Sequence, residues 1–283
     1  MQRRALGWTG VEVPVIGQGT WMIEGSRESE QRAVAALRLG LDLGMTHIDT
    51  AEMYGNGRAE ELVAEAIAGR RDEVFLVSKV LPSNASHQGT LRSCERSLRR
   101  LRTGHLDLYL LHWRGRYPLA ETMRAMEDLA AAGKIRFFGV SNFDVADVKE
   151  AQGAGLKGRL AANQVLYHLG DRGIERKLIP HCDQNGVAVV GYSPFGRGSF
   201  PAAGTPAGRV LNEIAERHGR TPRQVVLNFL TRLRGVFAIP KASDPGHVRE
   251  NSGAAGWTLA AEDEEALSRA FPAPSRDVPL GML

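Results

Sequence analysis

The chain has 283 residues, of which 43% are hydrophobic and 24% charged, and its formal net charge is +4. This balance is typical of a globular protein with enough apolar material for a core, and it excludes a disordered, fibrous or coiled-coil chain. The positive charge is mild and dispersed. It allows an anionic ligand, but it does not by itself predict nucleic-acid binding.

The cysteines and the apolar segments indicate a cytoplasmic protein. Cys94 and Cys182 form no Cys-x-x-Cys pair, which argues against a disulfide framework or a structural zinc site. Residues 1–10 lack an uninterrupted apolar run, so we expect no signal peptide. No stretch approaches the length of a transmembrane helix, so we expect no membrane span.

Eight short apolar runs alternate with helical patterns along the chain. The runs cover residues 15–17, 46–49, 74–79, 106–112, 135–140, 160–165, 187–191 and 236–239. Apart from the last, they start about 25 to 32 residues apart, which is the length of a strand, a helix and two short loops. Eight such units close a (β/α)8 TIM barrel. We therefore expect an α/β barrel that forms one domain over residues 1–283.

The segments between these runs have helical periodicity. Leu119, Met123 and Met126 recur on one helical face, and similar stripes precede Gly44 and Gly69. Glycine is a common residue just after a helix, so we expect both glycines to follow helix ends. The stripes predict helices that pack on the barrel rather than a ligand surface.

Three segments depart from the simple repeat. Residues 3–14 have the pattern of a β-hairpin around Thr9-Gly10, ahead of the first barrel strand and at the bottom of the barrel. Residues 194–206 are rich in glycine and proline and predict a long functional or mobile loop. The long gap before the last strand and the residues after it predict extra helices near the C-terminus.

Polar residues follow the predicted strands at the ends that form the active site in TIM barrels. Asp49 ends the second strand, Lys79 the third and His112 the fourth. The later strands contribute Ser141, Asn142, Gln164, Tyr192 and Ser193. Because parallel strands present these ends at one mouth, we expect the side chains to converge there.

Tyr54 adds a potential proton donor to this group. A free tyrosine has a pKa near 10, and a neighbouring ammonium group lowers it toward the range of a working acid. Lys79 can supply the ammonium group, Asp49 its counter-charge, and His112 a hydrogen bond that orients a carbonyl. The pattern predicts a general acid that protonates a carbonyl oxygen. A structural ion pair or a structural histidine remains the alternative for each residue taken alone.

Motifs along essentially the whole chain resemble those of the aldo-keto reductases. They are, in order, Gly17-Gln18-Gly19-Thr20-Trp21, Ile48-Asp49-Thr50-Ala51 with Tyr54, Ser78-Lys79, Leu110-Leu111-His112-Trp113, Gly139-Val140-Ser141-Asn142-Phe143, Asn163-Gln164-Val165, Tyr192-Ser193-Pro194, Ile239-Pro240-Lys241-Ala242-Ser243 and Arg249-Glu250-Asn251. The run over residues 163–170 is similar to that of short bacterial members that reduce methylglyoxal and other aldehydes.

The resemblance implies an NADPH-dependent reduction of aldehydes and ketones to alcohols. Tyr54 matches the proton donor of that family, and Asp49, Lys79 and His112 match its supporting residues. Hydride would pass from the nicotinamide to the carbonyl carbon while Tyr54 protonates the oxygen. The implied substrates are methylglyoxal-like 2-oxoaldehydes and other small carbonyl compounds, and a monomer is the default state of the family.

The cofactor site is expected without a Gly-x-Gly-x-x-Gly fingerprint, which the sequence lacks. Lys241 follows the last strand, and Ser243-Asp244-Pro245 has the pattern of a helix N-cap, which together make an anion site. In the family this segment holds the adenosine 2′-phosphate and favours NADP over NAD. His247 stands where many members have arginine, so we expect NADPH to be preferred over NADH with weakened discrimination.

The resemblance implies further cofactor contacts. Ser141, Asn142 and Gln164 match residues that hydrogen-bond the nicotinamide amide, and Tyr192 matches the aromatic residue that stacks on the ring. The other expected cofactor residues are Gly19, Thr20, Ser193, Ser243, Glu250 and Asn251. The loop over residues 196–204 would lie over the pyrophosphate, although a loose connection explains its composition equally well.

Aromatic and apolar residues are expected to line the substrate pocket. Trp21 and Trp113 follow the first and fourth strands, and Met53 precedes Tyr54. Such walls suit small carbonyl compounds. The short tail over residues 277–283 predicts an open pocket.

Two alternative functions remain open at this point. A reductase-like barrel of the same superfamily can bind NADP as a non-catalytic regulatory subunit, because fold does not fix function. A metal-dependent barrel hydrolase is the second alternative. The eight histidines contain no His-x-His or His-Glu-x-x-His set, so we expect no metal site.

Overall fold

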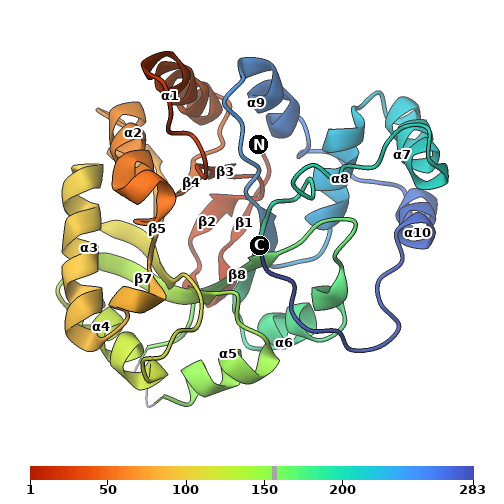
Figure 1. Ribbon diagram of the computed structural model, residues 1–283. Helices are drawn as coiled ribbons and strands as arrows, with labels where there is room; N and C mark the ends of the chain where they lie inside the picture. Colours follow the sequence, from red (N-terminus) through yellow and green to blue (C-terminus); the bar gives the residue numbers. More distant parts are fainter. Residues whose placement is uncertain (155–157) are drawn as a thin grey trace.

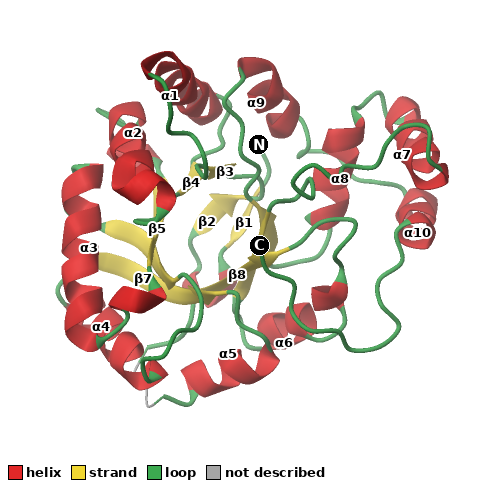
Figure 2. Ribbon diagram, in the orientation of Figure 1, coloured by secondary structure: helices red, strands yellow, loops and turns green. Residues whose placement is uncertain are grey.

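The computed structural model describes residues 1–154 and 158–283, and a parallel eight-stranded sheet stands at its centre with helices around it (Figures 1 and 2). The strands, in their order around the sheet, are β3 (Gln18–Gly19), β4 (His47–Asp49), β5 (Phe75–Val80), β6 (Leu106–Leu111), β7 (Ile135–Ser141), β8 (Ala162–Leu166), β9 (Ala188–Tyr192) and β10 (Val236–Ala238).

The first and last strands meet and close the sheet into the expected (β/α)8 barrel. Ile16 forms a parallel bridge with Ala238, and Gly19 forms one with Lys241. The backbone N–H of Gly17 also donates to Ala238 O at 2.8 Å. The pairing of this segment is therefore divided. Residues 15–17 bond to Ala238 of β10, whereas Gln18 and Gly19 pair with β4, and Gly19 also bridges to Lys241 beyond the end of β10.

This divided pairing corrects one predicted element. The first barrel strand lies at Gln18–Gly19, directly after the predicted range 15–17. The other seven strands overlap their predicted ranges, because their apolar runs are largely buried.

Helices follow the strands as the repeat requires. They are α1 (Arg27–Asp42), α2 (Arg58–Ala66), α3 (His87–Leu101), α4 (Leu119–Ala131), α5 (Val145–Gln152), α6 (Leu178–Gln184), α7 (Pro206–Arg217), α8 (Pro222–Leu230), α9 (Pro245–Ser252) and α10 (Ala261–Ala270). Both α7 and α8 follow β9, and both α9 and α10 follow β10, which confirms the extra helices near the C-terminus. Gly44 and Gly69 have φ angles of 84° and 78° just after α1 and α2, in the region that favours glycine.

Two apolar layers hold the barrel together. The interior is filled by strand side chains such as Val77, Leu110 and Phe237, which belong to one buried cluster. The space between strands and helices is filled by a second cluster, which includes Met123 and Met126 of the predicted stripe on α4. The mouth of the barrel is therefore rigidly supported from below and from outside.

The N-terminal hairpin closes the bottom of the barrel, as predicted. Strands β1 (Arg3–Ala5) and β2 (Glu12–Pro14) pair in antiparallel register. The Trp8 indole N–H donates to Leu160 O at 2.9 Å, and the Trp8 backbone N–H donates to Gly186 O at 2.7 Å. Leu160 and Gly186 precede β8 and β9, so these contacts lie at the end opposite the strand-end polar residues.

The C-terminal tail crosses to the barrel mouth, where the chain ends (Figure 1). Asp277 forms ion pairs with Arg176, at 2.7 Å, and with Lys177. Gly281 lies so close to the Asp171 side chain that a Cβ atom would clash with it. The tail is thus fixed at two points before it reaches the opening. Within the described part of the chain, no helix is long and apolar enough to cross a membrane.

Candidate active site

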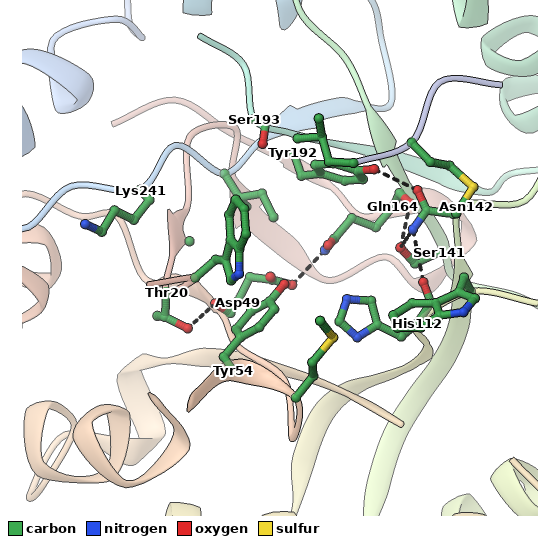
Figure 3. A pocket seen from close by; sticks show the side chains of 17 residues that line it. Thr20, Asp49, Tyr54, His112, Ser141, Asn142, Gln164, Tyr192, Ser193 and Lys241 are labelled. Carbon is green, nitrogen blue, oxygen red and sulfur yellow. Dashed lines mark hydrogen bonds between the residues drawn. The ribbon is translucent and has the colours of Figure 1, made fainter. Parts of the chain in front are cut away.

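A cavity of about 250 Å³ opens at the mouth of the barrel, where the strand-end residues converge (Figure 3). Its lining residues are Gly19, Thr20, Trp21, Asp49, Met53, Tyr54, His112, Trp113, Ser141, Asn142, Gln164, Tyr192, Ser193, Ile239, Lys241, Met282 and Leu283. The predicted convergence is therefore confirmed for residues from most of the strands.

Asp49, Lys79 and Tyr54 form one hydrogen-bonded group, in which Asp49 and Tyr54 line the cavity and Lys79 lies behind them. The Lys79 ammonium group donates to Asp49 Oδ1 at 2.6 Å and to Tyr54 Oη at 3.2 Å. Asp49 and Lys79 are 1% and 0% exposed. Because an ammonium group only donates hydrogen bonds, Tyr54 accepts here and its own O–H remains available to donate into the cavity.

The direction of the Tyr54 pKa corrects the sequence-based expectation. Burial raises the pKa of Tyr54 and is the largest effect. Lys79 lowers this pKa, as expected, but Asp49 raises it again, so the pKa stays above its usual value of 10. The sequence argument included the ammonium group and omitted desolvation of the phenolate. Tyr54 is consequently protonated at neutral pH.

The charge on Lys79 is maintained by its neighbours. Burial acts to lower the pKa of Lys79, whereas Asp49 and Tyr54 raise it and outweigh the burial. The ammonium group therefore faces the Tyr54 oxygen at neutral pH. It can stabilise a phenolate that forms when the tyrosine gives up its proton.

His112 is a neutral group beside the tyrosine. Its ring centroid lies 5.7 Å from that of Tyr54, at an interplanar angle of 77°. Burial, with a smaller contribution from Lys79, lowers the pKa of His112 to about 2. The imidazole therefore stays uncharged at neutral pH and can orient a substrate oxygen without adding a second ion.

Residues from β7, β8 and β9 form the opposite wall. Ser141 Oγ donates to Gln164 O at 2.8 Å, and Tyr192 Oη donates to Asn142 Oδ1 at 2.9 Å. The Asn142 amide donates to His112 O at 3.1 Å. Asn142 has a φ of 60°, a conformation uncommon outside glycine, which these bonds help to fix. The wall offers a fixed set of amide and hydroxyl groups to a planar amide ligand.

The segment before α9 supplies the expected anion site only in part. Lys241 lines the cavity, and burial lowers its pKa, opposed by Glu24. Asp244 caps α9 by accepting from the backbone N–H groups of Gly246 and His247. The cavity does not include the other expected residues of this segment, which are Ser243, His247, Glu250 and Asn251.

The predicted loop after β9 reaches back over the cavity. It spans residues 194–205, since Pro206 begins α7 with Thr205 as its cap. The Arg197 guanidinium lies 4.4 Å from the centroid of the Trp21 ring. The two sides of the mouth are thus joined by a cation–π contact at a predicted substrate residue.

Three residues of the cavity wall were not predicted: Ile239, Met282 and Leu283. The last two belong to the short tail, which had suggested an open pocket. No sequence signal marks these two residues, because the path of the tail depends on contacts with distant residues, such as those of Asp277 with Arg176 and Lys177. Arg114 forms ion pairs with Glu150 at 2.7 Å and with Asp147 at 2.9 Å, both on α5, so its charge is directed away from the cavity.

Within residues 1–154 and 158–283, no group of three His, Cys, Asp or Glu side chains is arranged to hold a metal ion. His47 of β4 is fully buried and contacts Phe75 edge to face with ring centroids 5.7 Å apart. Cys94 and Cys182 are buried and unpaired.

The sequence over residues 15–270 matches the Aldo/keto reductase family. The chain belongs to this family. Among its relatives, methylglyoxal reductase YeaE of Escherichia coli strain K12 is 46% identical over an alignment of 284 residues, which covers 100% of each chain. Glyoxal reductase of Bacillus subtilis is 33% identical over 91% of this aldo/keto reductase and 89% of its own length.

Solved structures of aldo/keto reductases superimpose closely on this one. A Klebsiella pneumoniae aldo/keto reductase in complex with NADP and acetate has a TM-score of 0.92 and 46% identity, with 98% of each chain covered. A Klebsiella pneumoniae aldo-keto reductase in complex with NADPH has a TM-score of 0.93 and 45% identity, with both chains fully covered.

Proposed function

We propose that this aldo/keto reductase uses NADPH to reduce methylglyoxal-like 2-oxoaldehydes and other small aldehydes and ketones to alcohols, with Tyr54 as the proton donor. The observation that carries the proposal is the Asp49–Lys79–Tyr54 group, which leaves a protonated phenol facing a small cavity. The methylglyoxal and glyoxal reductases among the relatives, and the NADP-bound structures, support the same chemistry.

The residues of the cavity suit a nicotinamide cofactor. Tyr192 presents an aromatic ring, and Ser141, Asn142 and Gln164 present hydrogen-bonding groups for a primary amide. Lys241, near the capped start of α9, supplies a cation for a phosphate. When bound, NADPH supplies the hydride. NADH remains the less favoured cofactor, since Lys241 would gain nothing from its unphosphorylated ribose.

The chain contributes the proton and the orientation of the substrate. His112, held neutral, orients the carbonyl oxygen toward Tyr54. As negative charge develops on that oxygen, Tyr54 gives up its proton and Lys79 stabilises the phenolate left behind. Trp21, Met53 and Trp113 exclude water from the reacting groups.

We extend the proposal to a single catalytic domain over residues 1–283 that works as a cytoplasmic monomer. The two buried, unpaired cysteines support a reducing compartment. The substrate is then a small molecule rather than a nucleic acid or a membrane lipid.

Tyr54→Phe tests the proposed acid. The change removes the hydroxyl and little volume, so NADPH binding should be largely kept while turnover of methylglyoxal falls about 10²- to 10⁴-fold. NADPH absorbance measures turnover, and quenching of tryptophan fluorescence measures binding. Tyr117→Phe, outside the cavity, is the matched control.

A bulky aromatic aldehyde measured beside methylglyoxal reports the size of the pocket. Near-normal turnover by Tyr54→Phe would refute the assignment of the acid. Tight NADPH binding by a wild-type enzyme that reduces neither aldehyde would instead favour the non-catalytic regulatory barrel.

A further inference from the structure

Gln164 makes a contact that its expected role in cofactor binding does not explain. Its side-chain Nε2 donates to Asp49 Oδ2 at 2.7 Å, across 115 residues of sequence (Figure 3). The orientation of this amide is fixed by chemistry, because a carboxylate oxygen accepts a hydrogen bond only from the NH2 end. Gln164 is 2% exposed, so water does not compete for the contact.

The contact completes the set of partners around the Asp49 carboxylate. Asp49 Oδ1 accepts from Lys79 and Oδ2 accepts from Gln164, so each oxygen has one partner from a different strand. The other groups that face this carboxylate electrostatically are Tyr54 and His47. His47 is neutral because burial lowers its pKa to about 4. Lys79 is therefore the cation of the group, and Gln164 is the neutral donor that keeps the carboxylate from turning.

Gln164 is itself firmly held. Its backbone O accepts from Ser141 Oγ at 2.8 Å and from the Asn142 backbone N–H at 2.8 Å. Its side chain also lines the cavity, with the NH2 end committed to Asp49. The amide oxygen is therefore the end that is left for a ligand. One rigid, planar group thus joins the cofactor wall to the ion pair behind Tyr54.

We propose that Gln164 is a positioning residue: its hydrogen bond fixes the Asp49 carboxylate and thereby holds Lys79 against Tyr54. We call this hydrogen bond the clamp. Through it, an amide bound at the Gln164 oxygen influences the proton donor Tyr54. Donors in a chain of hydrogen bonds polarise one another, so an amide donating to the Gln164 oxygen strengthens the bond from its NH2 group to Asp49. The clamp itself exists without cofactor, whereas its role in catalysis rests on the function proposed above.

Gln164→Glu tests the clamp in the cofactor-free protein. The introduced carboxyl group faces Asp49 at hydrogen-bond distance, so it binds there only in its protonated form and its pKa rises. A carboxyl group with a raised pKa in the folded state loses stability as pH increases above its unfolded pKa of about 4.3. The Tm deficit relative to wild type should therefore grow by about 5 °C or more between pH 5 and pH 8.

Ser141→Ala is the matched control for this measurement. It removes another expected contact to the nicotinamide amide but adds no ionisable group, so its Tm deficit should be the same at both pH values. A deficit of Gln164→Glu that does not change with pH would overturn the clamp.

Measurements of turnover test the link between the Gln164–Asp49 hydrogen bond and proton donation by Tyr54. Saturated with NADPH, Gln164→Glu should lose methylglyoxal turnover about tenfold for each pH unit above the pKa of the introduced group. Gln164→Met, which removes the donor without adding charge, should lower kcat about tenfold at every pH and covers the case in which Gln164→Glu does not fold.

A wild-type kcat for Gln164→Met, at saturating NADPH, would overturn the link. If wild-type enzyme reduces no aldehyde while the pH-dependent Tm deficit is observed, the proposed function fails and the clamp stands. The two failures are thus distinguished by the cofactor-free measurement.

Discussion

Breaking the Asp49–Lys79 pair from one side should destabilise the protein strongly. The two charged atoms are 2.6 Å apart, and both side chains are almost completely buried. Asp49→Asn leaves the ammonium group without its counter-charge, and removing one partner of a buried pair costs about 3–5 kcal/mol. At about 2 °C for each kcal/mol in a chain of this length, Tm should fall by about 6–10 °C.

The pH dependence of this loss has a definite sign. In the variant, burial lowers the pKa of Lys79 with no opposing Asp49, so the folded-state pKa drops below the unfolded value of about 10.4. Below that folded-state pKa, Lys79 is charged in both the folded and the unfolded protein, so the full cost of burying the cation lowers the stability. As the pH rises from there toward 10, the folded state releases the proton more readily than the unfolded state, and the stability recovers. The Tm deficit of Asp49→Asn should therefore shrink between pH 7 and pH 9.

The double variant Asp49→Asn/Lys79→Met separates stability from catalysis. Removing both charges should restore most of the lost Tm, while methylglyoxal turnover stays low because no cation remains beside Tyr54. Differential scanning calorimetry measures Tm, and NADPH absorbance measures turnover. Arg32→Met, which breaks an exposed pair with Glu28 at 3.3 Å, is the control and should change Tm by less than about 2 °C.

A Tm of Asp49→Asn within 2 °C of wild type would refute this reasoning, since it would mean that the ammonium group is solvated or already neutral. Restored turnover in the double variant would refute the role of Lys79.

Three further changes test other parts of the site. The pKa of His112 is about 2, so kcat should show no limb from this residue between pH 5 and pH 8; a limb in that range that His112→Gln removes would contradict its neutral state. Lys241→Ala should raise KM for NADPH about 10- to 100-fold and change KM for NADH little, and equal increases for both would exclude a phosphate contact. Deleting Met282 and Leu283 should raise KM for methylglyoxal and lower it for a bulky aromatic aldehyde, because both residues line the cavity; unchanged values for both aldehydes would show that the tail does not shape the pocket.

The amino-acid sequence was sufficient to predict the barrel and most of the residues that line its cavity. Strand–helix spacing and helical stripes are local patterns, and they predict alternating elements whose number is that of a closed barrel. Polar residues such as Asp49, Lys79 and His112 stand at the ends of apolar runs, so the parallel arrangement of the strands brings them to one mouth. Their convergence follows from chain order and needs no knowledge of long-range contacts.

How these groups act on one another depends on the tertiary structure. The pKa of Tyr54 depends on the balance between burial and two neighbouring charges, and burial is a property of the whole fold. The bond from Gln164 to Asp49 and the arrival of Leu283 at the mouth join residues that are far apart in sequence. No local pattern encodes such contacts, because the closure of the barrel and the anchoring of the tail bring these residues together.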